Sequence, residues 1–96
     1  MQNKINLSYF KNKSLVITGG TGSFGKTFLL KLIKSKIKKV IIFSRDEKKQ
    51  EELRNEIADQ RVKFIIGDVR DKESINEATI DVDFIFHAAA LKQVPS

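Results

Sequence analysis

The 96-residue sequence contains no cysteine and no tryptophan, and only one histidine and one proline. Without cysteine the chain has no disulfide framework and no thiolate metal site, and a single histidine argues against a structural zinc site. No apolar run approaches the roughly 20 residues that a membrane-spanning helix needs. Residues 1–13 lack the apolar core of a signal peptide. The sequence therefore predicts a cytoplasmic protein with no metal and no membrane partner.

Charge, by contrast, is abundant, and its balance is basic. The chain has 18 basic and 12 acidic residues, which give a formal net charge of +6. Such a surface suits anionic ligands, phosphates included. The densest group of lysines, within residues 31–39, contains no aromatic side chain that could stack on a base. We interpret these lysines as the solvated end of a helix and expect no nucleic-acid partner.

Short apolar runs alternate with polar stretches along the whole chain. Apolar runs predict strands over residues 15–17, 39–43, 62–66 and 84–86. Between them, helical spacing of apolar residues predicts helices over 23–35, over 47–58, and from Asp71 or Ser74 to residue 78. A strand–helix alternation of this kind predicts an α/β fold, in which a parallel sheet carries helices on both faces.

A glycine-rich turn directly follows the first expected strand. Residues 18–25 read Thr-Gly-Gly-Thr-Gly-Ser-Phe-Gly and contain the spacing Gly20-x-Gly22-x-x-Gly25. A tight turn, a close approach of the backbone to a pyrophosphate, and close packing of helix on strand each favour a glycine. Because strand, turn and helix follow one another, this run predicts a dinucleotide-binding fingerprint. The expected cofactor contacts here are Gly19, Gly20, Thr21, Gly22, Ser23, Phe24 and Gly25.

This fingerprint makes the fold class more specific. We expect residues 1–96 to be the N-terminal part of an NAD(P)-binding Rossmann domain, with residues 1–13 as a lead-in. The Rossmann-like parallel sheet is expected to be truncated after about four strands. Its fourth strand would then lie at an open sheet edge, where it is prone to pair with another chain.

The end of the second expected strand predicts which cofactor binds. The adenosine ribose meets the protein about 20 residues beyond the glycine turn. An acidic residue there would favour NAD, but Ser44 occupies the position and Arg45 follows it. Arginine can hold a 2′-phosphate through two N–H groups, and serine does not repel it. We therefore predict NADP, with Lys48 and Lys49 adding positive charge. In the alternative interpretation Arg45 is a surface residue and Asp46 binds the ribose.

Residues after the third and fourth strands complete the expected cofactor site. Asp68 can accept a hydrogen bond from an adenine amino group and Val69 can pack on the ring, although Asp68 could instead cap a loop. After the fourth strand, the small residues Ala88 and Ala89 let the backbone pass close to the cofactor.

Two further polar residues lie at the same end of the fourth strand. His87 is the only histidine, so it cannot be part of a histidine metal cluster, and we expect it to make a structural hydrogen bond. Lys92 lies just past the strand, where ligands bind in open α/β sheets, and is the candidate substrate contact.

Four segments resemble the inverting UDP-N-acetylglucosamine 4,6-dehydratases and related polysaccharide-biosynthesis proteins, which are extended short-chain dehydrogenases/reductases. The matching segments are residues 17–25, 43–50, 66–71 and 86–95. The resemblance implies that Thr21 to Phe24 contact the pyrophosphate and that Lys92 reaches a UDP-sugar. It also implies which residues surround the 2′-phosphate. These are Ser44, Arg45, Asp46, Glu47, Lys48 and Lys49.

The resemblance also implies a lyase reaction. In that family hydride leaves carbon four of the sugar for NADP⁺, water is eliminated across carbons five and six, and hydride returns to carbon six. The family's proton-transfer groups lie in a Thr-Asp-Lys segment and a (Tyr or Met)-x-x-x-Lys helix, and neither follows the fourth strand here. The only such spacing, Tyr9 to Lys13, precedes the first strand, and we interpret it as chance.

Because those groups are lacking, we expect no catalytic residue in this chain and little activity from it alone. The principal hypothesis is a fragment of a dehydratase-like enzyme, with a homologous or split-gene second half. The alternative is a non-catalytic nucleotide-binding module that docks on a full-length homologue through its open sheet edge.

Overall fold

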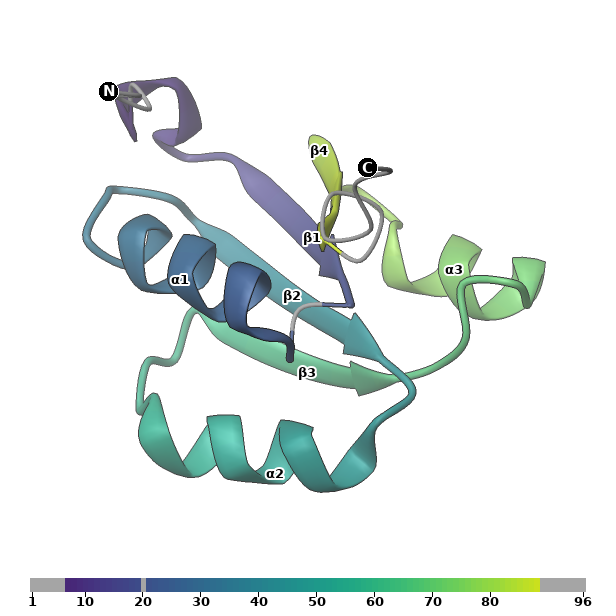
Figure 1. Cartoon of the computed structure of the whole chain (residues 1–96). Coiled ribbons are helices and arrows are strands. Elements are labelled where there is room, and N and C mark those ends of the chain that lie inside the picture. Colours follow the sequence, from purple (N-terminus) through teal and green to yellow (C-terminus); the bar gives the residue numbers. More distant parts are fainter. Residues whose placement is uncertain (1–6, 20, 89–96) are drawn as a thin grey trace, which may run out of the picture.

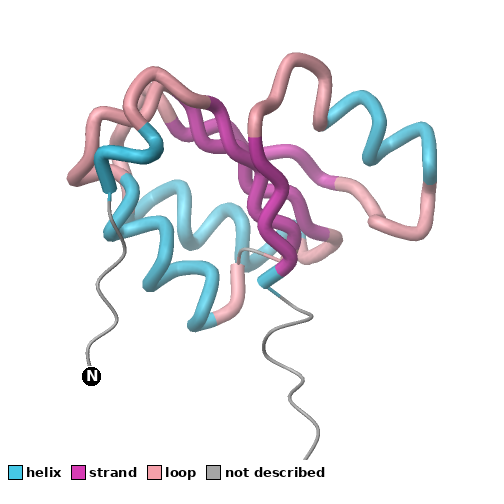
Figure 2. Tube along the Cα trace, turned by 90° about the horizontal axis from the view of Figure 1, so that it is seen from above, coloured by secondary structure: helices cyan, strands magenta, loops and turns pink. Residues whose placement is uncertain are grey.

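The computed structural model describes residues 7–19 and 21–88, which form a parallel sheet between helices (Figure 1). The elements are a 3₁₀ turn Leu7–Phe10, β1 Ser14–Thr18, α1 Ser23–Leu32, β2 Lys39–Ser44, α2 Glu47–Glu56, β3 Val62–Ile66, α3 Lys72–Ala78 and β4 Phe84–His87. The four strands are parallel and lie in the order β3-β2-β1-β4. Figure 2 shows α1 and α2 on one face of the sheet and α3 on the other. This arrangement confirms the predicted Rossmann-like fold.

The two sheet faces bury separate hydrophobic clusters. Successive side chains of a strand point to opposite faces, so a central strand that is covered on both sides needs an unbroken apolar run. Toward α1 and α2, Leu15 and Ile17 of β1 pack with Leu29 of α1 and Leu53 of α2. The smaller cluster toward α3 consists of Val16, Ile41, Phe43 and Ala78. No helix within the described residues is long and apolar enough to cross a membrane.

Both α1 and α2 end earlier in the structure than the sequence predicted. The helix predicted to reach residue 35 stops at Leu32, and Ile33 is its C-cap. The helix predicted to reach residue 58 stops at Glu56, because Ile57 turns to an extended conformation and buries its side chain in the core. At the start of α3, Asp71 rather than Ser74 is the cap, and its carboxylate accepts from the N–H of Glu73.

Arg61, just before β3, ties that strand to the connection between α1 and β2. Its guanidinium donates to the carbonyl oxygens of Ile33 at 2.6 Å, Ser35 at 2.9 Å and Ile37 at 3.3 Å. It also pairs with the Asp59 carboxylate at 2.7 Å. This hydrogen bond is the main reason why the pKa of Asp59 falls to about 2. These contacts, which we call the Arg61 clamp, fix the amino-terminal end of the sheet.

The β4 strand forms one edge of the sheet, as the sequence predicted. In the part of the chain that the structure describes, β4 pairs with β1 alone. Its side chains Phe84 and Ile85 remain 37% and 48% exposed. Phe10 packs edge-to-face against Phe84 and against Phe28 of α1, with ring centroids 5.5 and 6.3 Å apart. The edge therefore carries an aromatic surface that this part of the chain leaves partly uncovered.

Candidate functional site

A cavity of about 490 Å³ opens at the carboxyl ends of all four strands. Its lining residues are Thr18, Gly19, Phe43, Ser44, Arg45, Gly67, Asp68, Val69, Arg70 and His87. The chain runs from β1 outward to β3 on one side and returns to place β4 on the other side of β1. Open α/β sheets bind ligands at such a reversal of strand order, beyond the carboxyl ends of the strands. Its volume also falls within the usual range for small-molecule sites.

Thr18 and Gly19, at the start of the glycine turn, line this cavity. Gly19 has a φ of 69°, in the left-handed region that glycine tolerates best, and its N–H donates to the Phe43 carbonyl at 2.8 Å. Gly22 is the N-cap of α1 and, among the described residues, no side-chain cap hydrogen bond is made there. That turn has no acidic residue. The N–H groups at the start of α1 are therefore available to an anion.

The other residues that the sequence predicted as cofactor contacts differ in how far they are buried. Ser23 and Phe24 begin α1 and are exposed, Thr21 is half-buried, and Gly25 is buried within the helix. Ala88, just after β4, is buried in the larger core cluster. The predicted contacts Gly20, Ala89 and Lys92 lie outside the described residues.

At the end of β2, Ser44 and Arg45 lie in the cavity wall together with Asp68 from the end of β3. Arg45 Nη1 is 3.7 Å from Asp68 Oδ2, and 69% of the Arg45 side chain is exposed. Asp46 faces its own helix instead, since its Oδ1 accepts from Lys49 N at 3.0 Å as the N-cap of α2. The alternative in which Asp46 holds a ribose hydroxyl stays a prediction. Glu47, Lys48 and Lys49 belong to the exposed first turn of α2 and do not line the cavity.

Asp68 is held as a carboxylate by two arginines. Its oxygens accept from Arg70 N at 2.9 Å and from Arg70 Nη2 at 2.8 Å. The Arg70 hydrogen bonds, with a smaller contribution from Arg45, lower the pKa of Asp68 to about 2. The bond to the Arg70 backbone is the loop cap that one interpretation of the sequence expected. The carboxylate also lines the cavity.

His87, the last residue of β4, also lines the cavity. Its Nδ1 lies 2.8 Å from Thr18 Oγ1 of β1, and the two side chains are hydrogen-bonded. This bond confirms the prediction of a structural histidine. Among the described residues, no group of three or more His, Asp or Glu side chains is arranged to hold a metal ion.

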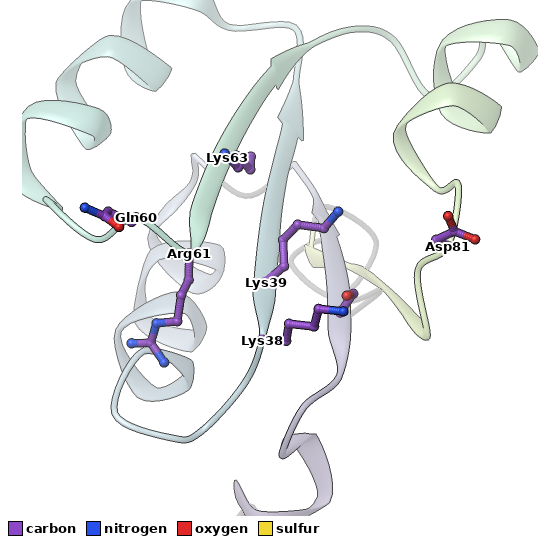
Figure 3. A pocket seen from close by; sticks show the side chains of 7 residues that line it. Lys38, Lys39, Gln60, Arg61, Lys63 and Asp81 are labelled. Atoms are coloured by element: carbon purple, nitrogen blue, oxygen red, sulfur yellow. The ribbon is translucent and has the colours of Figure 1, made fainter.

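A second hollow, of about 450 Å³, lies at the opposite end of the sheet. Lys38, Lys39 and Lys63 line it, together with Arg61 and Asp81 (Figure 3). Figure 3 shows that Arg61 points away from the lysines, which is consistent with its clamp on Asp59. The hollow lies beside the amino-terminal ends of the strands, where open α/β sheets do not bind their ligands.

Comparison with known proteins assigns the chain to a family. Residues 15–96 match the family described as polysaccharide biosynthesis protein. The chain belongs to this family. The UDP-glucose 4-epimerases of Rickettsia akari and Rickettsia bellii are 56% and 55% identical to it over 91 residues, which cover 91% of this chain and 27% of each relative. This family member thus spans about a quarter of the length of the curated relatives it matches.

Solved structures agree with the fold of this polysaccharide-biosynthesis family member. Pen from Bacillus thuringiensis superposes with a TM-score of 0.79 at 37% identity, over 82% of this chain and 25% of that one. The epimerase Mth375 of Methanothermobacter thermautotrophicus gives 0.70 at 25% identity, over 84% and 24%. WbmF of Bordetella bronchiseptica, solved with NAD⁺, gives 0.67 at 17% identity over 83% and 24%, which shows the fold alone. The chain thus belongs to the extended short-chain dehydrogenases/reductases.

Proposed function

We propose that this chain is the NADP-binding part of a sugar-nucleotide-modifying enzyme of surface polysaccharide or flagellin-sugar biosynthesis. The observation that carries the proposal is the cavity at the carboxyl ends of the strands. There a left-handed Gly19 and the exposed Arg45 line one space, and the uncapped α1 begins four residues after Gly19. Free N–H groups suit a pyrophosphate, and a guanidinium suits a second phosphate on the ribose.

Some of the residues proposed to hold the cofactor line that cavity, and the others belong to the glycine turn. The glycine turn from Gly19 to Phe24 would bind the pyrophosphate, and Ser44 with Arg45 the 2′-phosphate. Asp68 would accept from the adenine amino group while Val69, which is 51% exposed, packs on the ring. The cofactor would supply a hydride acceptor. Lys92 remains the proposed contact to a UDP-sugar.

The reaction that we favour is 4,6-dehydration of UDP-N-acetylglucosamine, with or without a further epimerisation. Curated relatives that share more than half of the aligned residues are named UDP-glucose 4-epimerases. Both reactions need hydride removed from carbon four of the sugar, so the same nicotinamide-binding part could serve either. After β4 the printed sequence has neither a Thr-Asp-Lys run nor a (Tyr or Met)-x-x-x-Lys spacing, and we propose that these 96 residues alone turn over no UDP-sugar.

Titration calorimetry of the 96-residue chain with NADP⁺ and NAD⁺ tests the proposal. We expect NADP⁺ to bind about tenfold more tightly, because a charge-assisted hydrogen bond to the 2′-phosphate is stronger than one to a neutral hydroxyl. Equal affinities would refute the NADP assignment. Binding of neither nucleotide would refute the dinucleotide site itself.

The aromatic edge favours a second candidate function, that of a module which docks on a full-length homologue. An apolar cavity of about 360 Å³ lies beside β4. It is lined by Tyr9, Phe10, Leu15, Phe24, Phe28, Phe84, Ile85 and Phe86. Exposed apolar surface next to an unpaired strand edge is what strand addition by another chain requires.

Ile85→Lys tests this docking function, because a lysine on an edge strand opposes pairing with another chain. If the module docks through β4, co-purification with a full-length homologue should fall at least tenfold in this variant. Ile80→Lys is the matched control, since Ile80 is 63% exposed but does not line the aromatic cavity. An unmodified chain that never co-purifies with the homologue would eliminate this candidate.

A further inference from the structure

Gln50 is a buried polar residue that belongs to neither hydrophobic cluster and is not one of the proposed cofactor contacts. It lies on α2 and is only 1% exposed. Its Nε2 donates to Ser44 Oγ at 3.0 Å, to the Ile65 carbonyl at 2.8 Å and, more weakly, to the Ser44 carbonyl at 3.4 Å. Its Oε1 is buried without a hydrogen-bond partner. Such an orphaned oxygen destabilises the fold, so the amide needs another explanation.

The surroundings of this amide determine its orientation. The carbonyl oxygens of Ser44 and Ile65 can only accept hydrogen bonds, so the amino group of Gln50 must face them. The same amino group therefore donates to the Ser44 hydroxyl, and the hydroxyl oxygen acts as the acceptor. One lone pair of Ser44 Oγ is occupied, and its proton remains available for a different acceptor.

Ser44 and Arg45 are neighbours in the cavity wall, and both then present hydrogen-bond donors there. A phosphate group accepts hydrogen bonds through several charged oxygens, whereas a ribose hydroxyl is both a donor and an acceptor. The donors of Ser44 and Arg45 are complementary to the phosphate, while the Asp68 carboxylate in the same wall is paired with Arg70.

We infer that Gln50 is a positioning residue, which holds the Ser44 hydroxyl as a donor toward the 2′-phosphate of the bound dinucleotide. This inference rests on the proposed NADP site and adds a specificity residue that does not itself touch the ligand. The unsatisfied Oε1 is then the stability cost of supplying an N–H to Ser44 from a buried position. An apolar side chain of the same length would fill the space without orienting the hydroxyl.

Gln50→Met is the direct test, because methionine matches the length of glutamine and offers no N–H donor. We expect the Kd for NADP⁺ to rise about fivefold, while the Kd for NAD⁺ changes less than twofold. The Ser44 carbonyl keeps its bond from Gly67 N at 2.9 Å, so the variant should fold. In a Ser44→Ala background the same substitution should have no further effect on either Kd.

The outcomes separate this inference from the proposed function. If the unmodified chain prefers NADP⁺ and Gln50→Met keeps that preference, the inference is wrong and the proposed function stands. An equal loss for both nucleotides would also overturn it, because it would indicate a general structural role. If the unmodified chain shows no preference for NADP⁺, the proposed function fails and the inference fails with it.

Nuclear magnetic resonance of the unmodified chain gives a readout that does not depend on the variant's folding. The side-chain amide signals of Gln50 should shift on addition of NADP⁺ and remain in place with NAD⁺, because polarisation passes through the Ser44 hydroxyl. Identical shifts with both nucleotides would overturn the inference.

Discussion

Replacing Gly67 by alanine should lower the free energy of unfolding by about 1–3 kcal/mol. A Cβ atom at this position would lie 2.6 Å from both Cε2 and Cζ of Phe43. Phe43 is fully buried with Val16, Ile41 and Ala78, so any displacement of its ring disturbs this cluster. In a domain of this size, each kcal/mol shifts Tm by about 4–8 °C. Thermal unfolding followed by circular dichroism measures the effect.

A second substitution shows whether the clash with the Phe43 ring is the cause. Phe43→Leu shortens the side chain and should itself destabilise the core, since it leaves a cavity. Combined with Gly67→Ala, it should cost less than the sum of the two single changes, because the new methyl group then has room. Strictly additive costs would show that the glycine is needed for another reason.

Arg45→Ala should weaken NADP⁺ binding about tenfold to a hundredfold and leave NAD⁺ binding nearly unchanged. The guanidinium is proposed to bind only the 2′-phosphate, and hydrogen bonds to charged groups are worth about 1.5–3 kcal/mol. Asp68 keeps its pairing with Arg70 at 2.8 Å, so the wall of the cavity should persist in the variant. Titration with both nucleotides measures the ratio of the two affinities.

Arg54→Ala is the matched control for that experiment, because it removes the same charge from a different place. Arg54 lies over the Phe64 ring, 5.0 Å from its centroid, and does not line the cavity. A comparable loss of NADP⁺ affinity in both variants would mean that overall charge, rather than Arg45, attracts the nucleotide.

The strands were predictable because each is a short apolar run bounded by polar residues. The strand expected over residues 62–66 has those bounds in the structure, and the others gain only a residue or two at their ends. Helix ends were harder to place, since tertiary packing decides them: Ile57 leaves the helix in order to enter the core. Phe24, which the sequence predicted as a cofactor contact, is 45% exposed and stacks on Phe86 of β4.

The sequence also located the cavity, because parallel strands bring their carboxyl ends together. It therefore placed Ser44, Arg45 and Asp68 in one wall without any knowledge of the distances between them. It missed Gln50, since a glutamine among lysines and glutamates looks solvent-exposed. The signal was its spacing with the apolar residues Leu53 and Ile57, both of which are buried, at i, i+3 and i+7.

The position of β4 has a consequence for how the molecule opens. Thr18 and His87, which join β1 to β4, are 69 positions apart in the chain, and closing so long a loop costs conformational entropy. Within the described residues, the strand also pairs on one side only and carries half-exposed side chains. It should therefore detach at a lower free energy than the centre of the sheet. Because His87 is one wall of the cavity, that detachment dismantles the binding site. A ligand that binds the cavity only while β4 is paired with β1 should therefore slow amide hydrogen exchange along β4.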